Sequence, residues 1–405
     1  MIQEQNDYAY WLSSVPDIGD RTIDKLLEAC KSPKGVYETV NEKLGRIVTE
    51  RQLESLQEAK RTWRLMEEYE ELKRKGISLV WRGSREYPEK LRNIPDAPFA
   101  LFYKGRLPEN GRLSVAIVGA RDCSQYGGYV AGELGRYLGE QGIQVISGMA
   151  RGIDGISQQA ALEAGGSSFG VLGCGADICY PKANRALYEA LIKDGGVLSA
   201  YPPGTPPVSR NFPPRNRIVS GLADAVVVIE ARSKSGTLIT VDMALEQGKE
   251  VYVVPGRVTD RLSDGCNRLL KQGAGIFLSP RDFVEELREL GGRQREKNKT
   301  REESKKREES KNMEENKKGQ ARGKGEAKVE NRNGKIETGS ISLPSDEMQA
   351  VYGLLDFLPQ SIDEIRTQLA EPLSSAEVGV ILMRLCMEGY AVQVSPGQFC
   401  VRYKS

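Results

Sequence analysis

The sequence VAIVGA at residues 115–120 is a short apolar run, rich in β-branched side chains, that ends near a glycine. Comparable apolar runs recur along the chain at residues 145–150, 169–173, 197–201, 225–231, 251–256 and 276–278. Helical patterns lie between these runs, among them Tyr129–Gln141 and Thr237–Gln247. Apolar strands joined by helices are typical of a parallel sheet covered on both faces. We therefore predict an α/β fold over residues 76–290: a Rossmann-like, doubly wound parallel sheet with right-handed crossovers.

The residues before this region predict a helical domain over 1–75. Within it, LSSVPDIGDRTIDKLL at residues 12–27 places a Pro-x-x-Gly turn before an amphipathic helix. Such a turn resembles half of a SAM or helix-hairpin-helix module, in which backbone N–H groups face a phosphate. A plain helical packing domain fits the same pattern equally well.

The residues after it predict two further parts. Residues 291–340 hold 16 basic and 10 acidic residues and no aromatic residue, which predicts a disordered charged linker. It would be either a solvated tether or a basic arm that meets nucleic acid. Residues 341–405 contain three helical patterns and then two short strands, which predicts a winged-helix-like domain. Its third helical pattern, 375–388, has Arg384 as its one basic residue, so a protein contact or a degenerate fold is favoured over base recognition.

The composition excludes several classes of function. The chain has no histidine, which removes Ser-His-Asp triads and the HExxH zinc site. Its seven cysteines form no CxxC pair, so reduced thiols are expected and no metal site. No apolar run approaches the roughly 18 residues of a membrane helix, and the first residues do not resemble a signal peptide. We expect a cytoplasmic protein without a membrane partner. Because the net charge is only +2, any basic surface must be local.

Ligands of open parallel sheets bind beyond the carboxyl ends of the strands. Here these positions are rich in glycine, arginine and hydroxyl groups, namely Gly119, Arg121, Ser147, Gly148, Arg151, Gly152, Ser235, Gly236 and Thr237. Exposed N–H groups at such turns attract anions, and arginine forks onto phosphate oxygens. The alternative is that the glycines serve only tight turns. The chain lacks GxGxxG and GxxxxGK[ST], so neither NAD nor ATP is expected as a cofactor. Asp154 is expected to cap a helix that begins near Gly155.

The segment NFPPRNRIVSGLA at residues 211–223 is the sharpest single feature. Pro213 and Pro214 predict an extended lead-in, after which Arg215, Asn216 and Arg217 open a helix that ends at Gly221. An aromatic side chain beside arginines suits a single-stranded nucleotide, with Phe212 stacking on the base. The alternatives are that Phe212 is a core residue and that Arg217 forms an intramolecular ion pair. Further upstream, Lys182 could meet phosphate and Asn184 could cap the next helix.

Seven motifs follow one another in the chain, namely VGAR (118–121), SGMARGID (147–154), GCGADICYPKAN (173–184), FPPRNRIVSGLAD (212–224), EARSKSGTL (230–238), VPGRV (254–258) and GCNRLLKQGA (265–274). In these motifs the chain resembles the DNA-processing protein A (Smf) family of recombination mediators. The resemblance is dense from about residue 87 to 290, and Ala200 departs from it where the family often has Glu.

The resemblance implies a non-catalytic protein that binds and protects single-stranded DNA in the Rossmann pocket. It also implies a homodimer that loads the RecA recombinase onto that DNA during natural transformation and recombination. Carried over motif by motif, the pocket would include Arg121, the turn at 148–152, Phe212, Arg215 and Asn216.

An enzyme is the competing class. Nucleotide phosphoribohydrolases with a related architecture carry a PGGxGTxxE signature whose glutamate assists ribosyl transfer. The comparable stretch here, residues 233–240, places Thr240 where that glutamate would stand. A neutral hydroxyl cannot stabilise a developing oxocarbenium ion as a carboxylate does. A nucleotide sensor that uses the same crevice is a third class, and tight mononucleotide binding without DNA binding would favour it.

Overall fold

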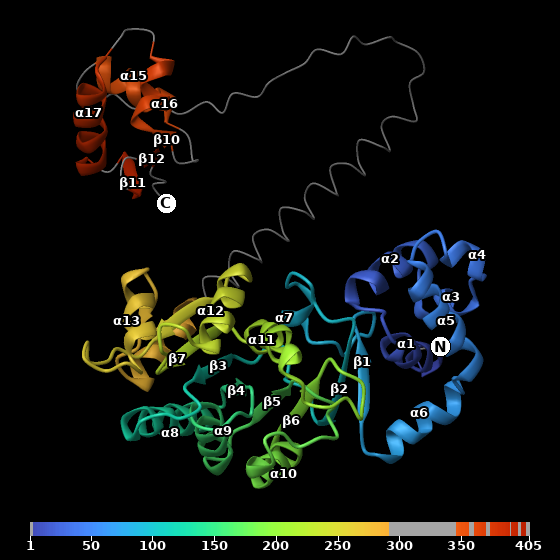
Figure 1. Ribbon diagram of the computed structural model, residues 1–405. Coiled ribbons are helices and arrows are strands. Elements are labelled where there is room, and N and C mark those ends of the chain that lie inside the picture. Colours follow the sequence, from blue (N-terminus) through green and yellow to red (C-terminus); the bar gives the residue numbers. More distant parts are fainter. Residues whose placement is uncertain are drawn as a thin grey trace, which may run out of the picture. The chain divides into compact units, whose positions relative to one another are not determined.

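The structure is a computed structural model in which the chain divides into two units, Met1–Lys311 and Asn312–Ser405 (Figure 1). It describes residues 3–290, 346–355, 360–369, 373–388, 390–395 and 398–401. The linker expected at 291–340 lies outside the described residues. Within the described ranges, no helix combines the length and the apolar character needed to cross a membrane.

A nine-stranded sheet forms the centre of the first unit, in the order β1-β2-β6-β5-β4-β3-β7-β8-β9. Its strands are β1 (Ser78–Trp81), β2 (Ala100–Gly105), β3 (Ser114–Gly119), β4 (Gln144–Ser147), β5 (Ser168–Leu172), β6 (Gly196–Ser199), β7 (Ala225–Ile229), β8 (Glu250–Val253) and β9 (Gly275–Ile276). All neighbours from β6 to β9 pair in parallel. The seven predicted strands are therefore confirmed, and the sheet is mostly parallel as expected.

Two strands were not predicted from the sequence. β2 pairs antiparallel with β6, and β1 pairs antiparallel with β2, so they extend the parallel sheet at one edge. The segments are short and are separated by a proline-containing stretch, residues 82–99. Without the partner strand β6, almost 100 residues further along the chain, neither segment has a pattern that distinguishes it from a loop.

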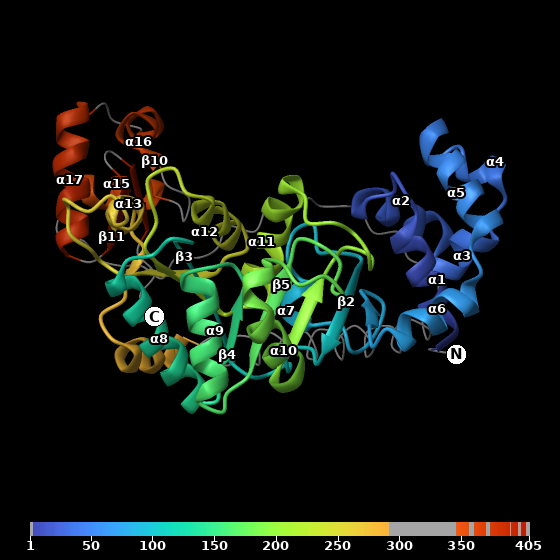
Figure 2. The ribbon, with the colours of Figure 1, turned by 60° about the horizontal axis from the view of Figure 1, so that its bottom comes forward.

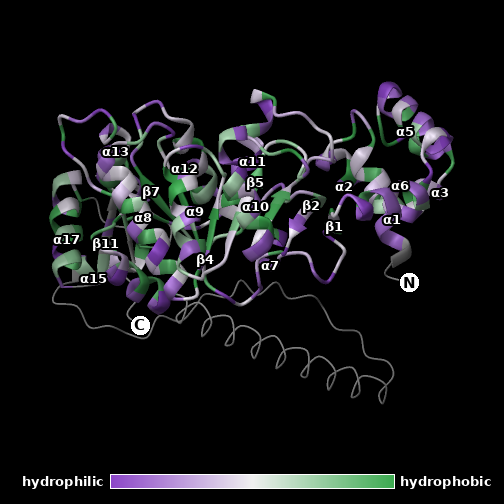
Figure 3. Cartoon of the chain, turned by 90° about the horizontal axis from the view of Figure 1, so that it is seen from below, coloured by the Kyte–Doolittle hydropathy of each residue, from purple (hydrophilic) through white to green (hydrophobic). Residues whose placement is uncertain are grey.

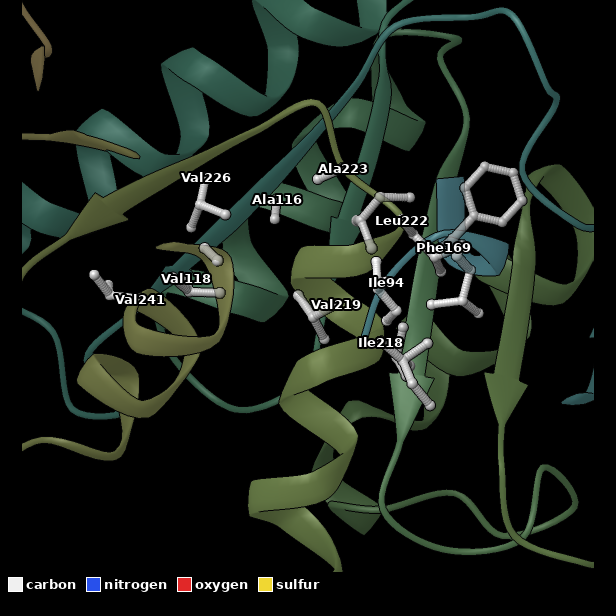
Figure 4. Packing of buried hydrophobic residues seen from close by; sticks show 14 of the residues in the cluster. Ile94, Ala116, Val118, Phe169, Ile218, Val219, Leu222, Ala223, Val226 and Val241 are labelled. Atoms are coloured by element: carbon white, nitrogen blue, oxygen red, sulfur yellow. The ribbon is translucent and has the colours of Figure 1, made fainter. Parts of the chain in front are cut away.

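The alternation of side chains along β3 shows how the sheet is buried on both faces. Ala116 and Val118 point to one face and belong to a cluster with Val219 of α11 (Phe212–Gly221) (Figure 4). Val115 and Ile117 point to the other face and pack in a second cluster. Each valine or isoleucine buried in this way contributes about 1.5–3 kcal/mol. This two-sided burial explains why the strands are continuously apolar rather than alternating.

The helices are distributed over the two faces (Figures 1 and 2). One face carries α8 (Gln125–Glu140), α9 (Ile153–Glu163), α10 (Arg185–Asp194) and a helix at residues 280–290. The other carries α7 (Glu89–Arg92), α11, α12 (Gly236–Glu246) and α13 (Asp264–Lys271). The hydropathy colouring follows this layering, with β4 largely green inside the layers and α5 (Glu50–Thr62) largely purple (Figure 3). The helices leave the carboxyl ends of the parallel strands accessible.

The N-terminal helices pack on the β1 end of the sheet (Figure 1). They are α1 (Gln3–Ser14), α2 (Asp20–Cys30), α3 (Pro33–Glu38), α4 (Asn41–Leu44), α5 and α6 (Leu65–Arg74). Their hydrophobic cluster contains the fully buried Trp11 and also Phe102 from β2. The rings of Tyr10 and Phe102 meet edge to face with centroids 5.7 Å apart. Residues 1–75 and the start of the sheet therefore share one core.

The second unit contains α15 (Asp346–Leu354), α16 (Ile362–Gln368), α17 (Ser375–Met387) and a sheet in the order β10-β12-β11. The strands are β10 (Gln360–Ser361), β11 (Ala391–Ser395) and β12 (Gln398–Val401). Capping boxes start both α16 and α17, with Glu364 and Glu377 each bonded to the N-cap serine. The Pro-Gly pair at residues 396–397, between β11 and β12 in the sequence, lies outside the described residues.

Glycines allow α8 and α9 to approach closely, and this gives a first testable prediction. A methyl group on Gly135 would overlap the backbone carbonyl of Ser157 in α9, whereas one on Gly132 would come no nearer than 3.9 Å to Ile156. We expect Gly135→Ala to lower the free energy of unfolding by about 1–3 kcal/mol through overpacking. The control Gly132→Ala should raise it by up to about 1 kcal/mol, because alanine favours helix. Urea unfolding followed by circular dichroism measures both, and equal stabilities would contradict the close contact.

Candidate nucleic-acid interface

The candidate site lies where the strand order of the sheet reverses. From β3 the chain builds the sheet outward through β4, β5 and β6, and it then returns to β7 on the other side of β3. At such a switch point the loops that follow the two strands diverge and leave a crevice. Two neighbouring cavities lie in this crevice, at the carboxyl ends of the strands, with volumes of about 330 Å³ and about 610 Å³.

We call the smaller cavity the aromatic pocket. It is lined by Arg121, Gly148, Ala150, Arg151, Leu172, Gly173, Cys174, Tyr180, Pro181, Phe212 and Arg215. We call the larger one the switch-point groove. Its wall combines the loop after β3, the loop after β7 and the first turn of α12, including Gly119, Arg121, Asn216, Arg232, Lys234, Ser235, Gly236, Thr237 and Thr240. Arg121, Phe212 and Arg215 line both cavities, so the two are continuous.

Phe212 borders the aromatic pocket and does not belong to any of the hydrophobic core clusters. Its ring lies against that of Tyr180, with centroids 5.6 Å apart, and the Arg215 guanidinium carbon is 5.8 Å from its centroid. Gly173 makes room for the ring, because a methyl group there would come within 2.9 Å of it. The alternative that Phe212 is a core residue is therefore wrong.

The prolines after Phe212 do not form the extended lead-in that the sequence predicted. α11 begins at Phe212 itself, and Pro213 and Pro214 stand in its first turn. Proline is tolerated there, because the first N–H groups of a helix have no intrahelical acceptor and its fixed φ suits the helix. As a result Phe212 and Arg215 both lie in the first turn of α11.

Arg215 is buried beneath the pocket and does not extend into solvent. Its Nη1 donates to the carbonyl oxygens of Gly148, at 2.7 Å, and of Val171. Burial lowers the pKa of Arg215, and the nearby Asp154 carboxylate opposes that shift. Its Nε has no hydrogen-bond partner within the described part of the chain. Arg215 thus forms part of the pocket's floor, and it gives the floor a positive charge.

Neither predicted helix cap makes a side-chain capping hydrogen bond. Asp154 lies inside α9, which begins at Ile153, and its carboxylate accepts from the Gly148 N–H at 3.1 Å. Asn184 occupies the N-cap position of α10, but its side chain donates to Met149 and Ala150 carbonyls at 3.0 and 3.1 Å. Both side chains therefore hold the loop after β4, since they bond backbone groups of Gly148, Met149 and Ala150.

The remaining glycine and serine candidates are placed as follows. The Ser147 hydroxyl is buried and donates to the Ile117 carbonyl at 2.6 Å, so it does not reach either cavity. Gly152 has a φ of +73° and packs so closely on the loop after β3 that a Cβ would overlap Ala120. Gly119 lines the switch-point groove, and a Cβ there would collide with the Ile229 carbonyl. Tight packing is therefore a role of these glycines.

The basic candidates differ in how far they are neutralised. Arg217 is paired with Asp96 at 2.7 Å and with Glu246 at 3.7 Å. The alternative that Arg217 forms an intramolecular ion pair is therefore confirmed. Arg151 lies 3.5 Å from Asp122, and both side chains are largely exposed. Lys182 is exposed at the start of a short 3₁₀ helix and lines neither cavity. Arg121 lines both cavities and has no carboxylate within ion-pair distance among residues that the structure describes.

Some lining residues were missed by the sequence interpretation. Tyr180 belongs to the motif that contained Lys182, and its aromatic character was the available signal. Arg232 and Lys234 lie in the loop after β7, and their position beside Ser235 could have pointed to them. The buried Cys174 also lines the aromatic pocket, where burial raises the pKa of its thiol to about 11. It therefore stays protonated near neutral pH and is not an activated nucleophile.

The described geometry is thus suited to a ligand with a flat ring and a phosphate group. The match to known proteins agrees with this chemistry. A family model described as DNA recombination-mediator protein A matches residues 78–288. The DNA processing protein DprA of Streptococcus pneumoniae is 44% identical over 200 residues, which are 49% of this chain and 71% of that protein.

The DNA processing protein DprA of Bacillus subtilis is 41% identical over 216 residues, covering 53% of this chain and 72% of that protein. The X-ray structure of DNA processing protein A from Streptococcus pneumoniae superposes with a TM-score of 0.61 and 35% identity. That superposition covers 69% of this chain and 96% of the other. Because the matched segment contains every strand of the sheet and both cavities, the chain belongs to the DNA recombination-mediator protein A family.

Proposed function

We propose that this protein binds single-stranded DNA at the aromatic pocket and delivers it to a RecA-type recombinase, without catalysing a reaction itself. The observation that carries the proposal is the juxtaposition of Phe212 and Tyr180 with Arg121, a cation that has no carboxylate partner in the described ranges. Aromatic faces stack on bases of any sequence, and a free guanidinium binds a phosphate. Membership of a recombination-mediator family supports the same function.

Single strands are expected to bind in preference to duplex. In a duplex the faces of the bases are covered by their neighbours, and a base reaches a pocket only if it is flipped out at a cost of a few kcal/mol. A single strand presents its bases without that cost. The pocket of about 330 Å³ is a concave site at the edge of the sheet, so a base must leave its stack to enter it.

Arg121→Ala tests the proposal directly. We expect it to weaken binding of a labelled single strand about 5- to 10-fold, because one charge-assisted phosphate contact is lost. The slope of log affinity against log salt should flatten by about 0.7 for that phosphate. Fluorescence anisotropy over a salt series measures both quantities, with single-stranded and duplex oligonucleotides of equal length.

Arg106→Ala is the matched control for that experiment. Arg106 is exposed and follows β2, at the amino ends of the parallel strands and so away from the cavities, where Gly105 pairs with Gly196 at the start of β6. Arg106→Ala removes the same charge as Arg121→Ala, but it should leave the affinity for single strands and the salt slope unchanged. If the two variants bind alike, the assignment of the aromatic pocket to DNA is wrong, and a nucleotide sensor becomes the better hypothesis.

We infer a cytoplasmic homodimer in which the described edge strand β9 lies near the contact, since Ile276 and Leu278 are 56% and 76% exposed. We infer a winged-helix-like C-terminal domain from α15–α17 and the β10-β12-β11 sheet. The N-terminal helices would form a SAM or helix-hairpin-helix-like module, and residues 291–340 a charged linker. Natural transformation and homologous recombination are the processes that such a mediator serves.

A further inference from the structure

The first turn of α12 offers a hydrogen-bond donor to the switch-point groove. The N-cap Ser235 accepts from the Thr237 N–H at 3.2 Å, which satisfies one of the orphan donors of the turn. The Gly236 N–H finds no acceptor in the described ranges. A methyl group built on Gly236 would meet nothing within 4 Å, so open space lies beside it. Helix N-termini of this kind attract anions through their N–H groups and the helix dipole.

Thr240 is a second, independent sign of a ligand at this place. One turn further into α12, its side chain is 3% exposed and lines the switch-point groove. Its hydroxyl makes no hydrogen bond with any residue that the structure describes. The hydroxyl oxygen is not among the buried atoms that are sealed off without a partner, so it is open to the switch-point groove. A ligand oxygen in the groove would supply the missing partner.

The charge around this turn favours an anion. Arg232 and Lys234 are exposed in the loop after β7, and neither lies within ion-pair distance of a carboxylate in the described part of the chain. Arg217 and Arg151, by contrast, are paired with acidic side chains. Arg121 faces the groove from the loop after β3 and is also unpaired within those ranges. Three cations that have no carboxylate partner among the described residues thus lie around one helix N-terminus.

The position of the turn is fixed relative to the aromatic pocket. The Thr237 hydroxyl donates to the Gly119 carbonyl at 3.2 Å, which ties α12 to the end of β3. Arg121 and Phe212 line both the groove and the pocket, so the two cavities open into each other. A nucleotide with its base against Phe212 can therefore extend its phosphate towards α12.

We propose that the first turn of α12, with Lys234 and the Thr240 hydroxyl, is a seat for a nucleotide phosphate next to the base held in the aromatic pocket. The proposal rests on the proposed single-strand binding and deepens it. The phosphate is either an internal phosphodiester of the strand or a phosphate at its 5′ end. The two sources share the same oxygen chemistry, and the experiment separates them.

Three substitutions test the seat. Gly236→Ala places a methyl group over the phosphate position, and it should not lower the melting temperature because alanine favours helix. Thr240→Val removes the hydroxyl and keeps the shape, whereas Lys234→Gln removes one charge. Lys193→Gln is the control, since Lys193 is exposed at the end of α10, just before β6 begins and so at the amino ends of the parallel strands.

We expect Gly236→Ala, Thr240→Val and Lys234→Gln each to weaken single-strand binding by about 3- to 10-fold, the usual net contribution of one hydrogen bond exposed to water. Lys193→Gln should bind like the wild type. The probes are labelled oligonucleotides of equal length that carry either a 5′-hydroxyl or a 5′-phosphate. If the variants lose affinity only for the 5′-phosphorylated strand, the seat holds a terminal phosphate. If they lose affinity equally for both oligonucleotides, the seat holds an internal phosphodiester.

The outcome that overturns the proposal is unchanged affinity of Gly236→Ala and Thr240→Val for both oligonucleotides while the wild type binds single strands. In that case the proposed function stands and the seat is wrong. If the wild type binds no single strand, the proposed function fails. The phosphate seat is then tested separately, with thymidine monophosphate as the probe. That probe should raise the melting temperature of the wild type and not of Gly236→Ala, whereas thymidine should raise neither; absence of this shift also overturns the seat.

Discussion

Replacing Arg215 by methionine is expected to lower the free energy of unfolding by about 3–5 kcal/mol, the range for removing one partner of a buried charge pair. The guanidinium donates to the carbonyl oxygens of Gly148 and Val171, and these would be left without that donor. Asp154, buried beside it, would lose the cation that offsets its burial. Urea unfolding of the full chain, followed by circular dichroism, measures the loss.

Arg217→Met is the matched control for this prediction. Arg217 stands two residues further along α11 and is paired with Asp96 and Glu246, whose side chains are 44% and 63% exposed. Because water replaces the lost partner on both carboxylates, the expected loss is at most about 1 kcal/mol. Equal losses for the two variants would show that Arg215 has no special role in the floor of the pocket.

The loss of unfolding free energy in Arg215→Met should depend on pH, because Asp154 titrates. Burial raises the pKa of Asp154, and Arg215 lowers it, so removing Arg215 raises the pKa of the folded state further. A carboxyl whose pKa is higher in the folded than in the unfolded chain binds more protons when folded. Stability then falls as the pH rises from the unfolded pKa, about 3.9, through the raised folded value.

The deficit of Arg215→Met should therefore be smallest in acid and largest near neutral pH. Adding Asp154→Asn to Arg215→Met removes the carboxyl and should abolish this extra dependence on pH. Unfolding curves at several pH values compare the single and double variants. A deficit that does not change with pH, or that is larger in acid, would contradict the coupling of these two side chains.

Phe212→Ala is expected to weaken binding of single-stranded DNA by about 1–3 kcal/mol, roughly 5- to 150-fold, the usual value of stacking one base on an aromatic ring. Phe212 lines both cavities and lies against Tyr180, so its loss removes the flat surface on which a base would rest. Its effect on affinity should exceed that of Arg121→Ala, because one phosphate contact contributes less. Anisotropy titrations at fixed salt concentration measure the change.

Two further substitutions at the same position separate stacking from packing. Phe212→Trp keeps an aromatic face and should retain most of the affinity, whereas Phe212→Leu keeps apolar volume but lacks the face and should bind nearly as weakly as Phe212→Ala. The salt slope should be the same in all three, since no charge changes. If leucine binds as well as phenylalanine, the ring packs against the protein only and is not a stacking platform.

Much of the parallel sheet could be predicted from local sequence. Strands buried on both faces, such as VAIVGA at 115–120, must be continuously apolar, and this pattern survives without knowledge of any partner. β1 and β2 could not be predicted in the same way, because each is short and depends on pairing with a distant segment. The helix that starts at Phe212 was placed too late, since two prolines suit both an extended segment and a first helical turn.

The sequence by itself determined the order of strands and helices, the glycine-rich and basic loops at one edge, and the family. Only the tertiary structure decided which charges are free: Arg215 is turned into the floor by the carbonyls of Gly148 and Val171, whereas Arg121 stays open to the cavities. The physical reason is that a local pattern sets secondary structure over a few residues. The partner of a charged side chain is instead set by residues brought near from other strands.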